Sequence, residues 1–243
     1  MKTAKTVIVI PAFNEGATIR SLVERCLHYR LPVIVVDDGS SDNTVAELQE
    51  LPVTLMRNPQ NSGKAATLWC GIKHALQEEA EQVITLDGDG QHSPEDIPAL
   101  LETASQHPRS IIIAARLKDN DQAPRARLAA NRFADFWISW AAGQWIHDTQ
   151  SGYRLYPSSL LAQLKPDLSR KHGFVFESKV LIDAARQGYP AHVTPISSSY
   201  HTNARASHFR PVADITRIVI MVAWSLFSRG MYLPGLWRAL KSR

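Results

Sequence analysis

Short apolar runs rich in β-branched residues alternate with helical patterns along the first half of the chain. The runs cover residues 6–10, 32–36 and 53–57, a fourth begins at 83, and 111–115 is expected to be a fifth strand. Helical patterns fill about 17–29, 43–51, 65–79 and the stretch after Ser93. Strands that alternate with helices in this way pack as a mostly parallel sheet joined by right-handed crossovers. The sequence therefore predicts an α/β fold with helices on the faces of the sheet.

The fourth run leads into VITLDGDGQH, residues 83–92, where two glycines break the strand and present the carboxylates of Asp87 and Asp89. A Ser-Pro pair with acidic residues behind it then opens a helix. The carboxylates thus lie on a strand-to-helix loop, at the edge of the sheet where ligands bind in open α/β folds. Together with the amide of Gln91 they suit a hard divalent cation that holds a diphosphate. The alternative interpretation is a solvated acidic turn.

Two further acidic loops are expected at the same edge. PAFNE, with Glu15, follows the first strand, and DDGSSD, with Asp38, follows the second. Acids outnumber bases there, which fits phosphate binding if a divalent ion intervenes. Ordinary turn chemistry explains each loop when it is taken alone. No GxGxxG follows the first strand and no GxxxxGK[ST] occurs, so the common dinucleotide and P-loop motifs are excluded.

Composition narrows the class of protein. The chain has 243 residues, 44% hydrophobic and 21% charged, which predicts one globular domain with a peripheral extension. A net charge of +4 is too small to indicate nucleic acid. Basic residues crowd the last quarter, which suits a phosphate or an anionic membrane surface, or else a solvated tail. Cys26 and Cys70 are expected to be reduced thiols, and the first residues carry no signal-peptide pattern. We therefore expect a cytoplasmic protein that binds the inner face of the cell membrane as a peripheral protein.

The order PxxNE, VVDDGSSDNT, NxGK and LDGDGQHSPED resembles the family 2 glycosyltransferases of GT-A fold, and among them the polyprenyl-phosphate sugar synthases such as dolichol-phosphate mannosyltransferase. The resemblance spans nearly the whole chain and is densest over residues 7–116. It implies a GT-A nucleotide-diphospho-sugar transferase fold, a UDP- or GDP-linked sugar donor, Mg²⁺ or Mn²⁺, and a polyprenyl phosphate or similar lipid as acceptor at the membrane surface. The family's central loop often reads DADLQ; here it is DGDGQ, which keeps the ligands and gives the loop more freedom.

The resemblance also implies roles for individual residues. Those implied to line the nucleotide and diphosphate pocket are Pro11, Phe13, Glu15, Val36, Asp38, Asp87, Gly88, Asp89, Arg116, Arg205 and His208. The implied metal ligands are Asp87, Asp89 and Gln91. The residues implied for catalysis are Asp89, Arg116, Asp148 and Glu177.

Asp148 lies in HDTQSGYR, residues 147–154, which resembles the TDxxSGFR segment that borders the acceptor site in the family. Arg154 is expected to meet an anionic acceptor there. A polyprenyl phosphate brings an oxygen that is already anionic and needs no strong base, whereas a hydroxyl acceptor would need Asp148 or Glu177 as its base. Two alternatives stay open: transfer to a hydroxyl of another lipid or small molecule, and a non-catalytic nucleotide-binding membrane adaptor.

The second half is expected to complete the domain. Residues 1–210 form the predicted glycosyltransferase domain, with 1–116 as nucleotide-sugar half and 117–210 as acceptor half, and 211–243 form an amphipathic, basic extension. Residues 118–127 are predicted to be a loop or lid. A helix over 131–146 carries aromatic residues on one face that suit either the core or a membrane interface. Residues 214–227 are too short to span a bilayer and suit a core helix, an interfacial helix or a dimer contact. Oligomeric state is left open.

Overall fold

The structure is a computed structural model that describes residues 4–117, 125–168, 173–196 and 211–243. In this described part, seven strands form one mixed sheet in the order β3-β2-β1-β4-β6-β5-β7. The strands are β1 Thr6–Ala12, β2 Val33–Asp37, β3 Thr54–Arg57, β4 Gln82–Thr85, β5 Ile111–Arg116, β6 Arg154–Pro157 and β7 Ala191–Ile196. All described pairings are parallel except those of β6, which runs antiparallel to β4 and β5. The predicted mostly parallel α/β sheet is confirmed.

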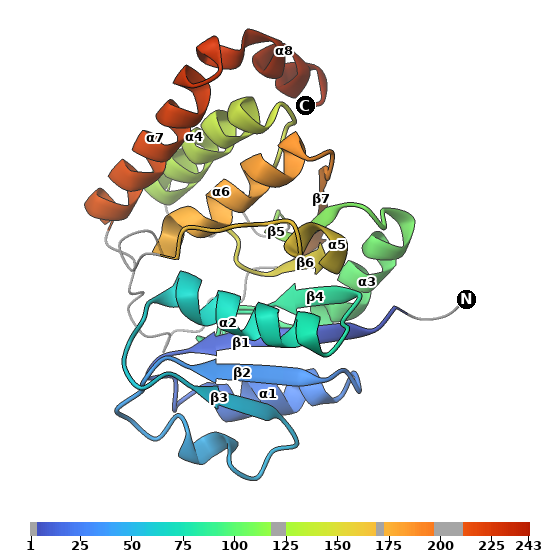
Figure 1. Cartoon of the computed structure of the whole chain (residues 1–243), viewed down its shortest axis with the longest axis vertical. Helices are drawn as coiled ribbons and strands as arrows, with labels where there is room; N and C mark the ends of the chain where they lie inside the picture. The colour runs from blue at the N-terminus through green and yellow to red at the C-terminus, as the bar shows by residue number, and fades with distance from the viewer. Residues whose placement is uncertain (1–3, 118–124, 169–172, 197–210) are drawn as a thin grey trace.

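Helices cover both faces of the sheet (Figure 1). They are α1 Ile19–Leu27, α2 Lys64–Gln77, α3 Ile97–Gln106, α4 Arg125–Ala142, α5 Ser158–Leu161, α6 Gly173–Arg186, α7 Pro211–Phe227 and α8 Leu233–Lys241, with short 3-10 turns η1 Ala46–Leu48, η2 Pro94–Asp96 and η5 Gly230–Tyr232. Successive residues of a strand face opposite sides, so Ile8 and Ile10 pack with α1 and α3, while Val7 and Val9 pack with α2. The core on the α2 side of the sheet continues through α4 and α6 to α7.

Two predicted elements differ from the structure, and one strand was not predicted. The helix expected over 43–51 is reduced to η1, because the Asp42 carboxylate accepts hydrogen bonds from the backbone and hydroxyl of Thr44, a local turn that competes with a helix. Strand β6 was not predicted, since its four residues are too few to show a period. The helix expected over 131–146 runs instead over 125–142, so the end of the predicted loop 118–127 is helical, while residues 118–124 lie outside the described part.

The aromatic face of α4 belongs mainly to the core. Trp140 is 8% exposed and donates from Nε1 to the carbonyl of Tyr232, 3.1 Å away. Phe136 and Trp137 pack against the same core, whereas Phe133 is exposed. The core interpretation therefore holds for most of this face. Within the described residues no single helix suffices to cross a membrane; Thr216–Phe227 and Gly230–Lys241, bent by 103°, would suffice together by length and composition only.

Candidate active site

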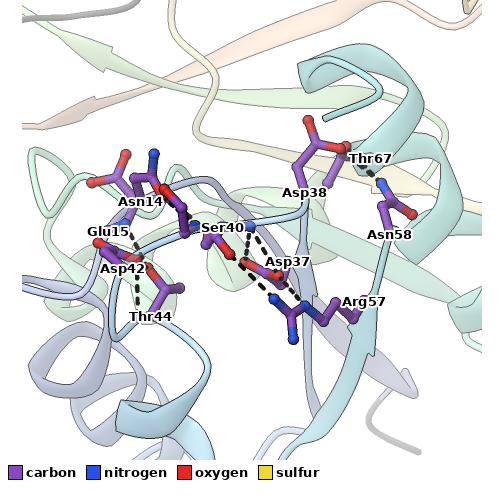
Figure 2. A network of polar contacts seen from close by, with 11 residues as sticks. Asn14, Glu15, Asp37, Asp38, Ser40, Asp42, Thr44, Arg57, Asn58 and Thr67 are labelled. Atoms are coloured by element: carbon purple, nitrogen blue, oxygen red, sulfur yellow. Dashed lines mark hydrogen bonds and ion pairs between the residues drawn. The ribbon is translucent and has the colours of Figure 1, made fainter. Parts of the chain in front are cut away.

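The loops that follow β1 and β2 are tied together at the carboxyl edge of the sheet (Figure 2). Asn14 adopts a left-handed φ of 57°, and its side-chain oxygen accepts a hydrogen bond from the backbone of Ser41 at 2.8 Å. The backbone amides of Asn14 and Glu15 donate in return to the hydroxyls of Ser40 and Thr44, both at 2.8 Å. Asn14 thus joins the two loops instead of capping α1, as would be expected from a residue that tolerates a left-handed backbone.

Asp38 is buried at the end of β2, and its carboxylate organises the loop before α2. One oxygen accepts hydrogen bonds at 2.8 Å from the side chain of Asn58 and from the backbone of Ser62, and the other accepts from the backbone of Gly63 at 2.9 Å. These bonds hold the chain that delivers Lys64 to the site. The predicted role of Asp38 near the nucleotide base stays a prediction.

Lys64, the first residue of α2, brings together two carboxylates from distant parts of the sequence. Its Nζ lies 2.8 Å from an oxygen of Asp87 and 3.2 Å from an oxygen of Glu177. Burial alone would lower the pKa of Lys64, but the two carboxylates outweigh it and raise the pKa. Lys64 in turn keeps the pKa of Asp87 below its usual range despite burial. Lys64 and Asp87 are therefore both charged at neutral pH.

Gly152 provides the space that this ion-paired cluster needs. A Cβ at this position would lie 2.9 Å from oxygens of both Asp87 and Glu177 and 3.2 Å from Nζ of Lys64. Any side chain would therefore push the cluster apart. The requirement explains the glycine in the SGYR segment, and it places that segment against the loop that carries Asp87 and Asp89.

A second ion pair joins Arg116, at the end of β5, to Asp148. The guanidinium makes two hydrogen bonds to the carboxylate at 2.8 and 2.7 Å, and the backbone amide of Arg116 adds a third at 2.9 Å. Burial would raise the pKa of Asp148, but these bonds and the positive charge lower it. Asp135 of α4 accepts hydrogen bonds from the backbone amides of Asp148 and Thr149, and these bonds fix the loop that carries Asp148. Asp148 is held as an ionised partner of Arg116, which suits it poorly to accept a proton.

Two residues that the sequence placed at the site have fully buried side chains. Arg154 is 0% exposed and donates to the backbone carbonyls of Thr149, Ser151 and Glu177, so it braces the loop and does not meet an acceptor. Val36 is also 0% exposed and packs with α2, where a Cβ on Gly71 would lie 2.9 Å from it, so its side chain belongs to the core and not to a pocket. Arg205 and His208 lie outside the described residues.

The loop that carries Asp89 is compact and closely packed on β1. Asp89 accepts a hydrogen bond from the backbone of Gln91 at 3.0 Å, and Gly90 has a φ of 72°. The carbonyl of Gly88 accepts a hydrogen bond from the hydroxyl of Thr18 at 2.8 Å, and a Cβ on Gly88 would lie 3.1 Å from the carbonyl oxygen of Pro11. The glycines thus let the loop approach the end of β1.

His92, which sequence reasoning gave no role, lies beneath this loop. It is 5% exposed, and its Nδ1 has no hydrogen-bond partner within the described part of the chain. Burial lowers its pKa although the carboxylates of Asp87 and Asp89 are near, so the ring is neutral. Its ring packs 5.3 Å from that of Tyr153. In the sequence, only the position of His92 at the end of the DGDGQH segment could have indicated a role for it.

The described residues offer few ligands to a divalent cation. No group of three His, Cys, Asp or Glu side chains that could hold a metal is found among the described residues. Asp87 already pairs with Lys64, whereas Asp89 makes no ion pair with Lys or Arg in that part of the chain. Asp89 is therefore the best placed ligand, with the buried, unpartnered Nδ1 of His92 close to the same loop. The carboxylate of Asp89 fits a hard cation that takes most of its ligands from the oxygens of a bound diphosphate, whereas an imidazole nitrogen suits softer transition metals.

Comparison with known proteins agrees with this architecture. A family model described as "Glycosyl transferase family 2" matches residues 7–164, and the chain belongs to that family. It is an enzyme of the glycosyltransferase class with the GT-A fold. Glucosyl-3-phosphoglycerate synthase from Mycobacterium tuberculosis, solved with Mn²⁺ and UDP-glucose, shares the fold with a TM-score of 0.64 at 20% identity, over 91% of this chain and 78% of that chain.

Two relatives are named for transfer to polyprenyl phosphates. The chain is 26% identical to UDP-N-acetylglucosamine--dolichyl-phosphate N-acetylglucosaminyltransferase of Methanococcus voltae, over 93% of this chain and 94% of the relative. It is 28% identical to polyprenol monophosphomannose synthase of Mycolicibacterium smegmatis, over 80% of this chain and 77% of the relative. The resemblance deduced from the sequence motifs is confirmed.

Proposed function

We propose that this glycosyltransferase moves a sugar from a UDP- or GDP-linked donor to a polyprenyl phosphate at a membrane surface. The observation that carries the choice of acceptor is the state of the two candidate bases. Asp148 is held by three hydrogen bonds from Arg116, and Glu177 is 6% exposed and paired with Lys64. An acceptor that arrives as an anion needs neither of them as a base, whereas a hydroxyl acceptor does.

The charges of the site suit two phosphate-bearing substrates. Asp89 is the residue we assign to Mg²⁺ or Mn²⁺, which when bound would neutralise charge on the departing diphosphate. Lys64 and Arg116 bring positive charge to the same edge, each already oriented by carboxylates. The ion pairs hold these side chains in place before substrate binds, so little reorganisation is needed when charge develops. The nucleotide is assigned to the loops after β1 and β2, with Pro11, Phe13, Glu15 and Asp38 beside it.

The acceptor is tested by a matched pair of lipids. Purified protein is incubated with UDP- and GDP-sugars, Mg²⁺ or Mn²⁺, and either a polyprenyl phosphate or the corresponding polyprenol, and the product mass and released nucleotide are measured. We expect a glycosylated product with the phosphate and none with the alcohol. Product from the alcohol, at a rate equal to or above that from the phosphate, would overturn the assignment. The same reaction with a chelator in place of added metal shows whether transfer needs the cation.

A further inference from the structure

Residues from the ends of α4 and α6, from the turn between α7 and α8, and from α8 line a cavity of about 420 Å³. Figure 1 shows how these helices lie. Its lining includes Gly143, Gln144, Arg186, Arg229, Tyr232 and Arg238, and none of the residues of the candidate active site. Glu177 and Arg186 lie nine residues apart on α6, which is about 13 Å along a helix axis. The cavity is thus at the opposite end of α6 from the ion-paired cluster.

Positive charge gathers in this cavity with little acid to balance it. Burial and then the charge of Arg229 lower the pKa of Arg186, as expected where two guanidinium groups line the same cavity. Within the described residues, the one carboxylate paired with any of the three arginines is that of Asp183, 4.0 Å from Arg186, and it also binds Lys179. Three arginines, of which only Arg186 pairs with a carboxylate in the described part of the chain, form a site suited to a phosphate group.

The hinge, which is the turn of residues 228–232 between α7 and α8, already partly orients two of the arginines. The guanidinium of Arg229 lies 3.9 Å above the ring of Tyr232, whose hydroxyl lies 3.5 Å from Arg238. Tyr232 itself is closely packed, since a Cβ on Gly143 would lie 3.0 Å from its hydroxyl. Tyr232 therefore acts as a fixed support between two of the cations.

Exposed apolar side chains flank the hinge on both sides. On α7, Ile220, Trp224 and Phe227 are 62%, 75% and 68% exposed. On α8, Leu233, Trp237 and Leu240 are 63%, 65% and 50% exposed. Both sets have the spacing i, i+4, i+7, which places each on one face of its helix. Helices with exposed Trp and Leu beside basic residues lie in the interface of a membrane, with apolar side chains inserted and cations at the headgroups.

We propose that the cavity binds the phosphate of an anionic phospholipid headgroup and so holds the α7–α8 pair on the membrane, at a site separate from that of sugar transfer. The proposal rests on the membrane location in the proposed function. A free phosphate would meet the same arginines, but the two exposed apolar faces beside the hinge favour a phosphate that carries acyl chains.

The test uses two double variants that remove equal charge from the same end of the chain. Arg229→Ala with Arg238→Ala removes cations of the cavity, and Lys241→Ala with Arg243→Ala removes cations outside it. Co-sedimentation is measured with vesicles of phosphatidylcholine alone and with vesicles in which phosphatidylglycerol replaces a third of it. Each surface cation accounts for about fivefold in binding to an anionic surface. We expect the cavity variant to lose at least about tenfold more affinity than the control, on the anionic vesicles only.

A second arm separates the lipid from a soluble phosphate. Glycerol 3-phosphate is titrated without vesicles, and binding is followed by tryptophan fluorescence. Equal losses by the two variants, or no sedimentation of the unaltered protein, would overturn the proposal. Saturable binding of glycerol 3-phosphate that only the cavity variant loses, with unchanged sedimentation, would overturn the lipid in favour of a soluble anion. Hydrolysis of the sugar nucleotide without vesicles should stay unchanged in both variants, and this reports on the active site independently.

Discussion

The carboxyl edge of the sheet and the α7–α8 layer differ in how their positive charges are paired. At the edge, Lys64 and Arg116 are each matched by carboxylates from distant parts of the chain. On α7–α8, Arg229 and Lys241 lie over aromatic rings, 3.9 and 5.2 Å from the ring centres, and neither makes an ion pair within the described residues. The first region pairs these two cations with its own carboxylates and so fixes them before a substrate arrives. The second leaves cations and apolar side chains for a partner to satisfy.

Two tryptophans test whether the α7–α8 layer leaves its apolar side chains for a partner while the rest of the molecule packs its own. Trp140 is 8% exposed and hydrogen-bonded, and Trp224 is 75% exposed. Trp140→Ala should lower the free energy of unfolding by about 3–5 kcal/mol, because it leaves a cavity between α4 and the hinge. Trp224→Ala should change it by less than about 0.5 kcal/mol and instead weaken vesicle binding. Urea denaturation measures both, and similar losses in the two variants would show that α7 is packed in solution.

The next largest effect is expected from Asp89, which makes no ion pair with Lys or Arg among the described residues. Asp89→Ala should reduce transfer by about 100- to 1000-fold, the range seen when one electrostatic contact to a developing charge is removed. Its stability should stay near that of the unaltered protein, since Asp89 accepts one described hydrogen bond, from its own loop. Asp183→Ala, on the outer side of α6, is the control and should keep full activity. A variant at position 89 with unaltered turnover would remove this residue from the mechanism.

Much of the edge could be predicted from the sequence because its signals are local. The alternation of strands and helices and the loop after β4 are each contained in one short stretch, so position alone brought Asp87 and Asp89 to the correct edge. The pairing of Lys64 with Glu177 joins residues 113 positions apart, and no spacing within a helix or strand indicates it. The sequence also did not indicate that the side chain of Arg154 points inward. A basic residue in a polar segment is expected to face solvent or a ligand, and the backbone carbonyls that bind it are known only from the structure.

The space around Gly152 offers a test that leaves every charge in place. Gly152→Ala would put a methyl group 2.9 Å from oxygens of Asp87 and Glu177. A displacement of the order of 1 Å at a reacting site can cost about 100-fold, so we expect a loss of up to that size in kcat/KM. Gly188→Ala is the control, because a Cβ there would meet nothing within 4 Å, although its φ of 79° is restrictive for alanine. It should lower stability slightly and leave transfer unchanged.

A smaller effect distinguishes ion pairing from proton transfer at Glu177. Glu177→Gln keeps an oxygen to accept from Lys64 and removes the negative charge and the ability to take up a proton. If the acceptor is already an anion, we expect transfer to fall by less than about tenfold, whereas loss of a general base costs about 100- to 10,000-fold. The pH dependence of kcat/KM should keep its shape. A loss in the larger range would favour the hydroxyl acceptor and contradict the proposed one.

The smallest effect concerns a pair on the opposite face of the sheet, where Arg25 of α1 binds Glu95 of η2 through both carboxylate oxygens. The hydrogen bond from Arg25 lowers the pKa of Glu95 from 4.5 to about 2. A lowered pKa stabilises the fold above the pKa of the unfolded chain, and that stabilisation is lost as the pH falls from 4.5 towards 2. Because the side chains are 37% and 56% exposed, solvent limits the gain to about 1 kcal/mol or less. Glu95→Gln should therefore be slightly less stable than the unaltered protein at pH 7, and the difference should vanish near pH 2. A difference that is constant over this range would assign the effect to packing and not to charge.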